Sequence, residues 1–191
     1  MVEKVPPGHM RLFSGQLVDP LNLRPDQVRF DDICFALGNF CRYGGHCHCH
    51  FSVAEHTLDV FNLVRFAGGN RDEQLYALIH DASEAYTGDI PQPIKERLGI
   101  RKIEEQINKT VAIALGLEPD RFLYAIEQGI VKRFDVDAGS EERSWLWTPE
   151  ATHRDAKPRH WGKMLHSQIA NTLIARGFDN DQLVQLGVFK D

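Results

Sequence analysis

Apolar residues recur at helical spacing along most of the chain, and glycine and proline residues separate the recurring segments. A helix repeats its faces about every 3.6 residues, so apolar residues three and four positions apart line one side. On this pattern we predict helices over residues 31–41, 52–67, 70–86, 94–98, 103–115, 119–147 and 161–176. Residues 11–25 contain Gly15, Pro20 and Pro25 and are predicted to be extended or looped.

The boundaries of the predicted helices carry recognisable signals. Ser52-x-x-Glu55 is a capping-box pattern at the start of the second helix. The longest predicted segment contains Gly129 and Gly139, and either glycine could break it. No pair of strands with alternating apolar and polar residues is evident. The sequence therefore predicts an all-α bundle of about six or seven helices, with sites between facing helices, in a single domain over residues 1–191.

The composition is ordinary for a globular domain and narrows the range of partners. The chain has 191 residues, of which 42% are hydrophobic and 26% charged. The net charge of −5 provides no basic field for nucleic acid or an anionic membrane. No apolar run approaches the roughly 20 residues of a membrane span. We expect no nucleic-acid partner and no membrane association, and an anionic ligand would need local positive charge from a metal, arginine or lysine.

Two features of the sequence indicate the cytoplasm. The segment Met1–Met10 has no apolar stretch of the kind that signal peptides carry. The four cysteines, Cys34, Cys41, Cys47 and Cys49, lie close together, whereas a disulfide scaffold would spread them along the chain. We therefore expect a cytoplasmic protein with reduced thiols.

Two independent oddities in the polar pattern indicate a metal site. His56 lies on the apolar face of its predicted helix, and the polar face of the next helix carries His80, Asp81 and Glu84, within about 100° of one another. Taken singly, a buried histidine is usually a satisfied core residue, and a polar helix face is usually solvated. A shared divalent ion explains both, because imidazole nitrogens and carboxylate oxygens ligate first-row metals.

A second carboxylate would complete the site, and two are available on a later helix. Asp135 shares a helical face with Val131 and Ala138, which favours an inward position, whereas Asp137 lies on another face. We select Asp135. The predicted site is one divalent ion (Mn, Co, Mg, Fe or Zn) held by His56, His80, Asp81 and Asp135.

The order His56, His80-Asp81, Asp135 resembles the H…HD…D signature of the HD-domain metal-dependent phosphohydrolases. The string His-Asp-Ala-Ser-Glu-Ala-Tyr-Thr-Gly-Asp-Ile-Pro is similar to the 5′-deoxynucleotidase-like branch, and Arg42-Tyr-Gly-Gly-His46 resembles phage- and plasmid-type members. Val-Lys-x-x-Asp135, with Glu142 seven residues on, also matches the family pattern. The resemblance covers roughly residues 11–146 and implies an HD-domain helical bundle.

The resemblance also implies roles for the polar residues around the metal. Glu84 and Asp89 would be catalytic, because a carboxylate beside a metal can orient water or move its proton. Arg42 would bind the substrate phosphate. Where the family has a tryptophan that helps to select the sugar, this chain has Tyr43, so deoxyribose selectivity is not implied. The remaining candidate substrate contacts are His46, Lys95 and Lys132, although a lysine taken singly is more often solvated surface.

The segment His46-Cys-His-Cys-His50 packs five metal-capable side chains into five positions. Structural zinc sites usually combine one Cys-x₂₋₄-Cys pair with a distant second pair, and this sequence has no second pair. We therefore expect a loop near the active site. A regulatory or adventitious metal at this segment stays open.

These features predict an HD-type phosphohydrolase that converts (deoxy)nucleoside 5′-monophosphates to nucleoside and phosphate. A (deoxy)nucleoside triphosphate triphosphohydrolase, such as a dATPase, is the alternative with the same chemistry. A non-catalytic metal- or nucleotide-binding module is the alternative of another class, and Glu84 and Asp89 argue against it because binding alone needs neither. The base, the sugar, the native metal and assembly into a homo-oligomer stay open.

Overall fold

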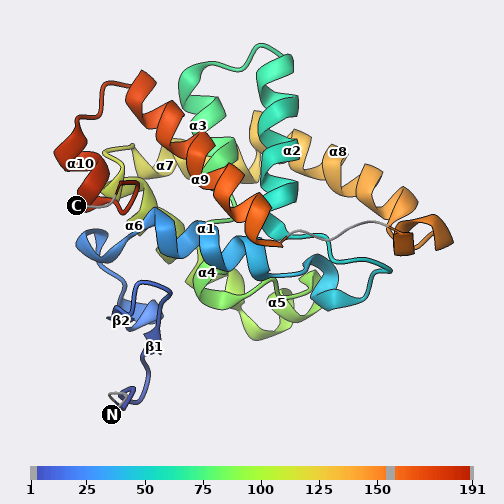
Figure 1. Cartoon of the computed structure of the whole chain (residues 1–191), viewed down its shortest axis with the longest axis horizontal. Coiled ribbons are helices and arrows are strands. Elements are labelled where there is room, and N and C mark those ends of the chain that lie inside the picture. Colours follow the sequence, from blue (N-terminus) through green and yellow to red (C-terminus); the bar gives the residue numbers. More distant parts are fainter. Residues whose placement is uncertain (1–3, 154–157, 190–191) are drawn as a thin grey trace.

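The computed structural model describes residues 4–153 and 158–189, so the ends of the predicted 1–191 domain and the first three residues of Met1–Met10 lie outside them. In the described residues the fold is all-α, as predicted, with eight helices of seven residues or more and one two-stranded sheet (Figure 1). The helices are α1 (Phe30–Asn39), α2 (Val53–Phe66), α3 (Arg71–Ile79), α4 (Glu84–Thr87), α5 (Gln92–Leu98), α6 (Ile100–Ala114), α7 (Pro119–Glu127), α8 (Ile130–Trp145), α9 (Pro158–Ala175) and α10 (Asn180–Gln185).

The N-terminal segment forms a small antiparallel hairpin below α1 in Figure 1, and all of it except Met10 lies within the residues predicted to be extended or looped. Its strands are β1 (Met10–Arg11) and β2 (Leu17–Val18). The Asp32 carboxylate in α1 accepts hydrogen bonds from the Ser14 backbone N–H at 2.5 Å and the Ser14 hydroxyl at 2.8 Å. Asp32 therefore attaches the hairpin to the bundle. Short 3₁₀ turns follow at η1 (Pro20–Asn22), η2 (Pro25–Gln27), η3 (Arg42–Gly45) and η4 (Pro149–His153).

Helix α2 lies at the centre of the bundle and contacts α1, α3, α8 and α9. Its inward residues Val53, Val60 and Val64 are fully buried, and burying apolar surface of this kind is the main driving force of folding. Helix α9 lies across α1 in Figure 1. A Cβ at Gly162 of α9 would lie only 2.6 Å from the Cys34 carbonyl oxygen, so glycine is needed for this close packing.

Helix α2 begins where the capping-box pattern placed it, and the Ser52 half of that pattern is formed. The Ser52 hydroxyl accepts a hydrogen bond from the Glu55 backbone N–H at 3.1 Å, and Ser52 pairs with Cys41 in an isolated β-bridge. The cap sets the phase of the helix, and it places His56 on the buried side beside Val53 and Val60. His56 has no exposed surface.

The prediction of one helix over residues 70–86 is wrong. Helix α3 ends at Ile79, and a turn leads to the short α4, which ends before Gly88 at φ 81°. Within the turn, hydrogen bonds span three residues, as from the Glu84 backbone N–H to the Asp81 carbonyl oxygen at 2.9 Å. Such bonds tighten the chain, so His80, Asp81 and Glu84 are not arranged on one regular helical face.

The later helices follow the predicted pattern with smaller corrections. The segment beginning at Pro119 is broken at Gly129, where a Cβ would lie 2.9 Å from Ala125 Cα, whereas Gly139 lies inside α8. Helix α10 was not predicted. It begins with Asp179, whose carboxylate accepts from the Gln182 backbone N–H at 2.9 Å.

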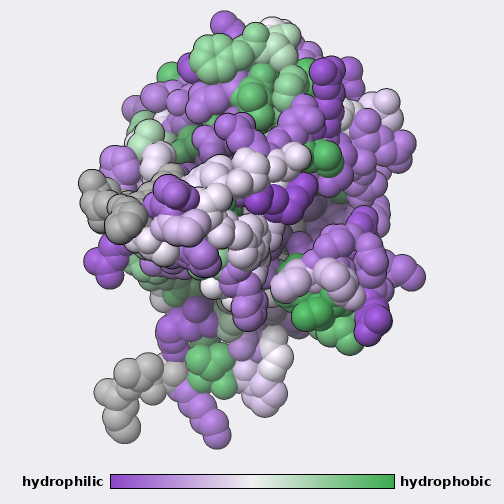
Figure 2. All heavy atoms as spheres, turned by 90° about the vertical axis from the view of Figure 1, so that its right-hand side faces the viewer, coloured by the Kyte–Doolittle hydropathy of each residue, from purple (hydrophilic) through white to green (hydrophobic). Residues whose placement is uncertain are grey.

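The surface shows no broad apolar face in the view of Figure 2. This side of the molecule is mostly hydrophilic, and its hydrophobic residues form small separate groups. Within residues 4–153 and 158–189, no helix combines the length and the apolar character needed to cross a bilayer.

Candidate metal centre

Three metal-ligating side chains meet from three separate parts of the chain. His56 lies in α2, His80 directly follows α3, and Asp135 lies in α8. Each offers one ligand atom, and these atoms lie within 4.8 Å of one another. His56 Nε2 lies 3.2 Å from Asp135 Oδ1. Two ligands that share one ion through bonds of about 2.0–2.2 Å lie roughly 3–4.4 Å apart, so this group could hold a metal ion.

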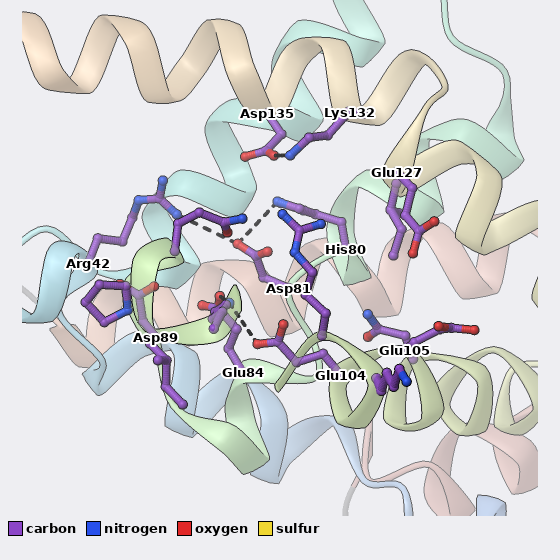
Figure 3. A pocket seen from close by; sticks show the side chains of 18 of the residues that line it. Arg42, His80, Asp81, Glu84, Asp89, Glu104, Glu105, Glu127, Lys132 and Asp135 are labelled. Atoms are coloured by element: carbon purple, nitrogen blue, oxygen red, sulfur yellow. Dashed lines mark hydrogen bonds and ion pairs between the residues drawn. The ribbon is translucent and has the colours of Figure 1, made fainter. Parts of the chain in front are cut away.

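Asp81 lies beside the same group. Its Oδ2 is 3.2 Å from His80 Nε2 and 3.8 Å from His56 Nε2, which are also spacings between ligands of one ion. Figure 3 shows Asp81 directed toward His80, with Asp135 above them on α8. Asp137, the alternative to Asp135, is exposed, so the inward position predicted for Asp135 from its helical face is confirmed.

Hydrogen bonds at Nδ1 orient both imidazole rings toward one point. His80 Nδ1 lies 2.8 Å from the Ala77 carbonyl oxygen, which can only accept, and His56 Nδ1 lies 2.5 Å from Glu142 Oε1. In the neutral rings Nδ1 therefore carries the proton and Nε2 the lone pair. His80 Nε2 is buried and has no hydrogen-bond partner among the residues that the structure describes. These residues fit a metal ion, because ligand histidines commonly donate their other ring nitrogen to such acceptors.

Glu142 was not selected from the sequence as a site residue. In the structure it connects the candidate ligand His56 to Arg42 and Tyr43. It is buried, and its Oε2 accepts from Arg42 Nε at 2.9 Å and from the Tyr43 hydroxyl at 2.8 Å, while Oε1 faces His56. Glu142 follows Asp135 by two helical turns and shares its face. That spacing and the family pattern were the available signals. The partners themselves lie 86 to 100 residues away along the chain.

In this cluster, burial shifts the pKa of each group toward its neutral form, and the charges of the neighbouring groups shift it the other way. Burial lowers the pKa of His80, but Asp81 and Asp135 outweigh it and raise that pKa to about 9. Burial raises the pKa of Asp81 and of Asp135, but the two imidazoles outweigh it, and both pKa values are lowered. The carboxylates stay ionised, and the negative charge that favours protonated His80 equally favours a metal cation.

The two carboxylates predicted to be catalytic lie next to the ligands. Glu84 opens α4 and is only 6% exposed, and Asp89 follows the end of α4. Glu84 Oε2 and Asp89 Oδ2 are both buried, and within residues 4–153 and 158–189 neither has a hydrogen-bond partner. Burial and then Asp81 raise the pKa of Glu84 well above its usual value, against the effect of Lys95. Burial also raises the pKa of Asp89, against the effect of Arg42. Raised pKa values suit carboxyl groups that accept and return protons.

The two lysines predicted to contact substrate already have carboxylate partners. Lys95 Nζ lies 2.8 Å from Glu84 Oε1 and 2.7 Å from Glu104 Oε1, and its side chain is only 12% exposed. Lys132 Nζ lies 2.7 Å from Asp135 Oδ2. Both lysines line a cavity over the candidate ligands, and the ammonium group of each neutralises a neighbouring carboxylate.

A cavity of about 740 Å³ lies over these residues. Arg42 and Tyr43 form part of its wall, and Arg42 Nη1 lies 3.8 Å from Asp81 Oδ2. Figure 3 shows Arg42 and Asp89 at one side of the cavity and Glu105 and Glu127 at the other. His46 is exposed and is not among the described residues that line the cavity, so the structure does not bring it to the site.

The Cys–His segment, residues 46–50, forms no comparable group. Cys47 Sγ lies 3.8 Å from Cys41 Sγ, whereas the ring nitrogens of His48 and His50 lie 2.9 and 3.2 Å from backbone carbonyl oxygens. Among the described side chains, groups with the spacing of metal ligands include no residue of this segment. The expectation of a loop is confirmed, and the loop is not assembled as a second metal centre.

Comparison with known proteins gives similarity without an assigned activity. The chain is 34% identical to the uncharacterized protein YfdR of Escherichia coli K12 over 111 residues, which is 58% of this chain and 60% of that protein. It is also 34% identical to an uncharacterized protein of Rhodobacter capsulatus over 109 residues, covering 55% of this chain and 56% of that protein. The matches thus span about three fifths of the length of these relatives or less. No family model matches the chain.

Proposed function

We propose that this chain is an HD-type, divalent-metal-dependent phosphohydrolase that releases phosphate from (deoxy)nucleoside 5′-monophosphates. The observation that supports this most is the orientation of His56 and His80. Both rings are held at Nδ1 by acceptors, so that both Nε2 atoms face Asp81 and Asp135. On an ion that takes six ligands, such as Mn, Mg or Fe, four ligand atoms from these residues would leave positions for water and a phosphate oxygen.

The residues around the ligands can carry the proton steps of hydrolysis. A divalent ion held here would polarise a phosphoryl oxygen and lower the pKa of water. Glu84 lies beside the ligands and would accept the proton of the attacking water. Asp89 would return a proton to the sugar oxygen as the phosphorus–oxygen bond breaks. Burial raises the pKa of both carboxyl groups, which favours their taking part in proton transfer.

Arg42 is the group best placed to hold the phosphate. Its Nε is fixed by Glu142, and the guanidinium remains part of the cavity wall. The planar fork of an arginine can donate to two phosphate oxygens together. Burial lowers the pKa of Arg42, but Glu142 and Asp81 outweigh it and raise that pKa further, so the charge is permanent.

The charge of the cavity favours a monophosphate over a triphosphate. Acidic residues outnumber basic residues in its lining, and three of the cations, Arg42, Lys95 and Lys132, already pair with carboxylates. A triphosphate brings more negative charge than a monophosphate and would meet more repulsion here. The other two cations of the lining are Arg101, whose Nη2 lies 3.8 Å from Glu96 Oε1, and its neighbour Lys102, so the excess of acidic residues carries this preference.

A metal-resolved activity panel tests the proposal. The protein would be stripped with a chelator, reloaded with Mn, Co, Mg, Fe or Zn, and assayed for free phosphate from ribo- and deoxynucleoside 5′-mono- and triphosphates. We expect phosphate release from monophosphates that depends on the metal. Asp135→Asn should abolish it, while Asp137→Asn, the same change two residues away at an exposed position, should not.

Three outcomes of the panel would contradict the proposal. Release of an intact triphosphate would assign the triphosphohydrolase reaction. Metal binding without turnover of any nucleotide would assign a binding module. Equal loss in the Asp135 and Asp137 variants would remove the cluster from the chemistry.

A further inference from the structure

Beside the proposed catalytic residues, the Lys95 ammonium group forms ion pairs with two carboxylates, Glu84 and Glu104. These three residues come from three different elements, α4, α5 and α6. Lys95 Nζ lies 2.8 Å from Glu84 Oε1 and 2.7 Å from Glu104 Oε1, and the three side chains are only 7–13% exposed. Figure 3 shows Glu84 and Glu104 side by side in the cavity, below Asp81.

This arrangement gives Lys95 a task other than binding phosphate. Two carboxylate oxygens within 2.8 Å take up two of the three hydrogen-bond donors of the ammonium group and neutralise its charge. Pulling it toward a substrate would leave Glu84 or Glu104 buried without its partner, and an uncompensated buried charge is strongly unfavourable. Lys95 therefore belongs to the wall of the cavity.

Glu84 depends on this lysine for its position. Its Oε1 is held by Lys95, and its Oε2 has no hydrogen-bond partner among the described residues. A lysine is a poor anchor on its own, because its four-carbon stem is flexible and its ammonium group is a point charge without a preferred plane. The second carboxylate, Glu104, removes that freedom by holding Nζ from the side of α6.

We infer that Glu104 is a positioning residue: it fixes Lys95, and through Lys95 it sets where the Glu84 carboxylate stands relative to the metal ligands. The inference rests on the proposed function in assigning Glu84 a proton-transfer role. The geometric part concerns the Glu84 side chain alone and does not depend on the reaction. A purely structural role, in which the charges only fasten α6 to α4 and α5, would leave Glu84 in place when Glu104 is neutralised.

The kinetic test compares Glu104→Gln with Glu96→Gln in the metal-loaded enzyme. Glu96 is the matched control, because it also pairs α5 with α6, with its Oε1 3.8 Å from Arg101 Nη2, but its side chain is 60% exposed and is not among the described residues that line the cavity. We expect Glu104→Gln to lower kcat by about tenfold to a hundredfold, the range for slight misplacement of a catalytic group, with KM changed much less. Glu96→Gln should leave kcat unchanged.

The route through Lys95 is tested by a second background. In Lys95→Met, kcat should already be low, and adding Glu104→Gln should lower it no further. A further loss in that background, or a fall of kcat that is equal in Glu104→Gln and Glu96→Gln, would overturn the inference.

A structural measurement separates this inference from the proposed function. Crystal structures of wild type and Glu104→Gln should show the Glu84 carboxylate displaced in the variant, with metal content unchanged. If wild type hydrolyses no nucleotide but Glu84 still moves, the proposed function fails and the positioning role stands. If Glu84 keeps its position in Glu104→Gln, the positioning role is wrong whatever the enzyme does.

Discussion

The Cys–His segment and the candidate metal centre both contain side chains that can ligate metals, but among the described residues only the candidate centre brings such side chains together. Residues 46–50 place five metal-capable side chains in five consecutive positions, and the described structure assembles no ligand group from them. In the candidate centre, His56 and Asp135 are 79 positions apart in the sequence, yet His56 Nε2 lies 3.2 Å from Asp135 Oδ1. A high density of metal-capable residues in one short segment is therefore a poor predictor of a metal site.

The difference has a physical cause in how each region satisfies its backbone. The end of a helix leaves carbonyl groups without partners. The ring nitrogens of His48 and His50 are used on the carbonyl oxygens of Thr148, just after α8, and Asn39, the last residue of α1. The helices that carry His56 and Asp135 satisfy their own backbone, which leaves the side chains for one another. Thiol chemistry adds to the contrast: burial and the nearby Cys41 raise the pKa of Cys47 to about 11, and metals bind the thiolate.

The largest expected effect is loss of the metal itself. Purified protein should carry about one equivalent of divalent metal, and His80→Ala should lose it. The doubly substituted Cys47→Ser/Cys49→Ser protein should retain it. Elemental analysis checks both variants. Full metal content in His80→Ala, or loss in the cysteine variant, would reverse the roles that we assign to the two regions.

Next in size is the effect of the carboxylate that lies beside the metal centre. Glu84→Gln keeps the shape of the side chain but removes its capacity to take a proton. The rate should fall by about 10²–10⁴-fold, the usual contribution of a general acid or base, while metal content and fold are retained. Metal analysis and kcat should be measured on the same sample, since loss of metal would show that Glu84 is a ligand instead.

Arg42 links the two regions, because it begins the turn that precedes the Cys–His segment and reaches back to Glu142. Arg42→Ala should lower kcat/KM for nucleotides by about tenfold to a hundredfold, which corresponds to losing about one charge-assisted hydrogen bond. Metal content should be unchanged. A small phosphate ester that does not fill the cavity should be affected less, and unchanged kinetics for nucleotides would limit Arg42 to packing.

Glu142 supplies the support that the Cys–His segment lacks. Glu142→Gln removes a charge that His56, Arg42 and Tyr43 share. Changes of this kind behind a ligand typically weaken metal binding by about 10–100-fold. Metal affinity by competition with a chelator is the measurement, and Glu141→Gln, at the exposed neighbouring position, is the control. Similar affinities in the two variants would show that Glu142 does not orient His56.

The smallest effect is expected from the cysteines on stability. The Cys47 thiol donates to the Cys49 carbonyl oxygen at 3.0 Å, and a serine hydroxyl can make the same bond. Cys47→Ser should therefore change the free energy of unfolding by less than about 0.5 kcal/mol, as at surface positions without a special role. Urea unfolding measures this, and a shift several times larger would mean that the segment is structurally tighter than its bonds indicate.

Periodicity predicted those parts of the centre that depend on one helix at a time. It placed His56 on the buried side of α2 and separated the inward Asp135 from the exposed Asp137. It failed between Ile79 and Glu84, where short-range hydrogen bonds bend the chain away from a regular helix. Apolar spacing does not reveal such a turn, because Ala82 and Ala85 are buried in either geometry.

Hydrogen bonds and ion pairs between residues far apart in the chain could not be predicted from the sequence. Lys95 could be placed near the site but not between Glu84 and Glu104, because that depends on how α5 and α6 dock. Glu142 was visible as a match to a family pattern, and its bonds to Arg42 and Tyr43 were not. A single sequence specifies the faces of helices well, and tertiary contacts decide which polar groups share a proton or a charge.

The wide separation of the ligands along the chain has a consequence for how the protein folds and how long it persists. An ion can join His56 to Asp135 only after α2 and α8 have docked, and the entropy of closing that long loop must first be met by burial of the apolar core. The ion therefore finds little to bind in the early stages of folding. Interactions absent from the transition state slow unfolding rather than speed folding. Loading with metal should act mainly on the lifetime of the native state, and the apo protein would be the form that opens and is degraded sooner.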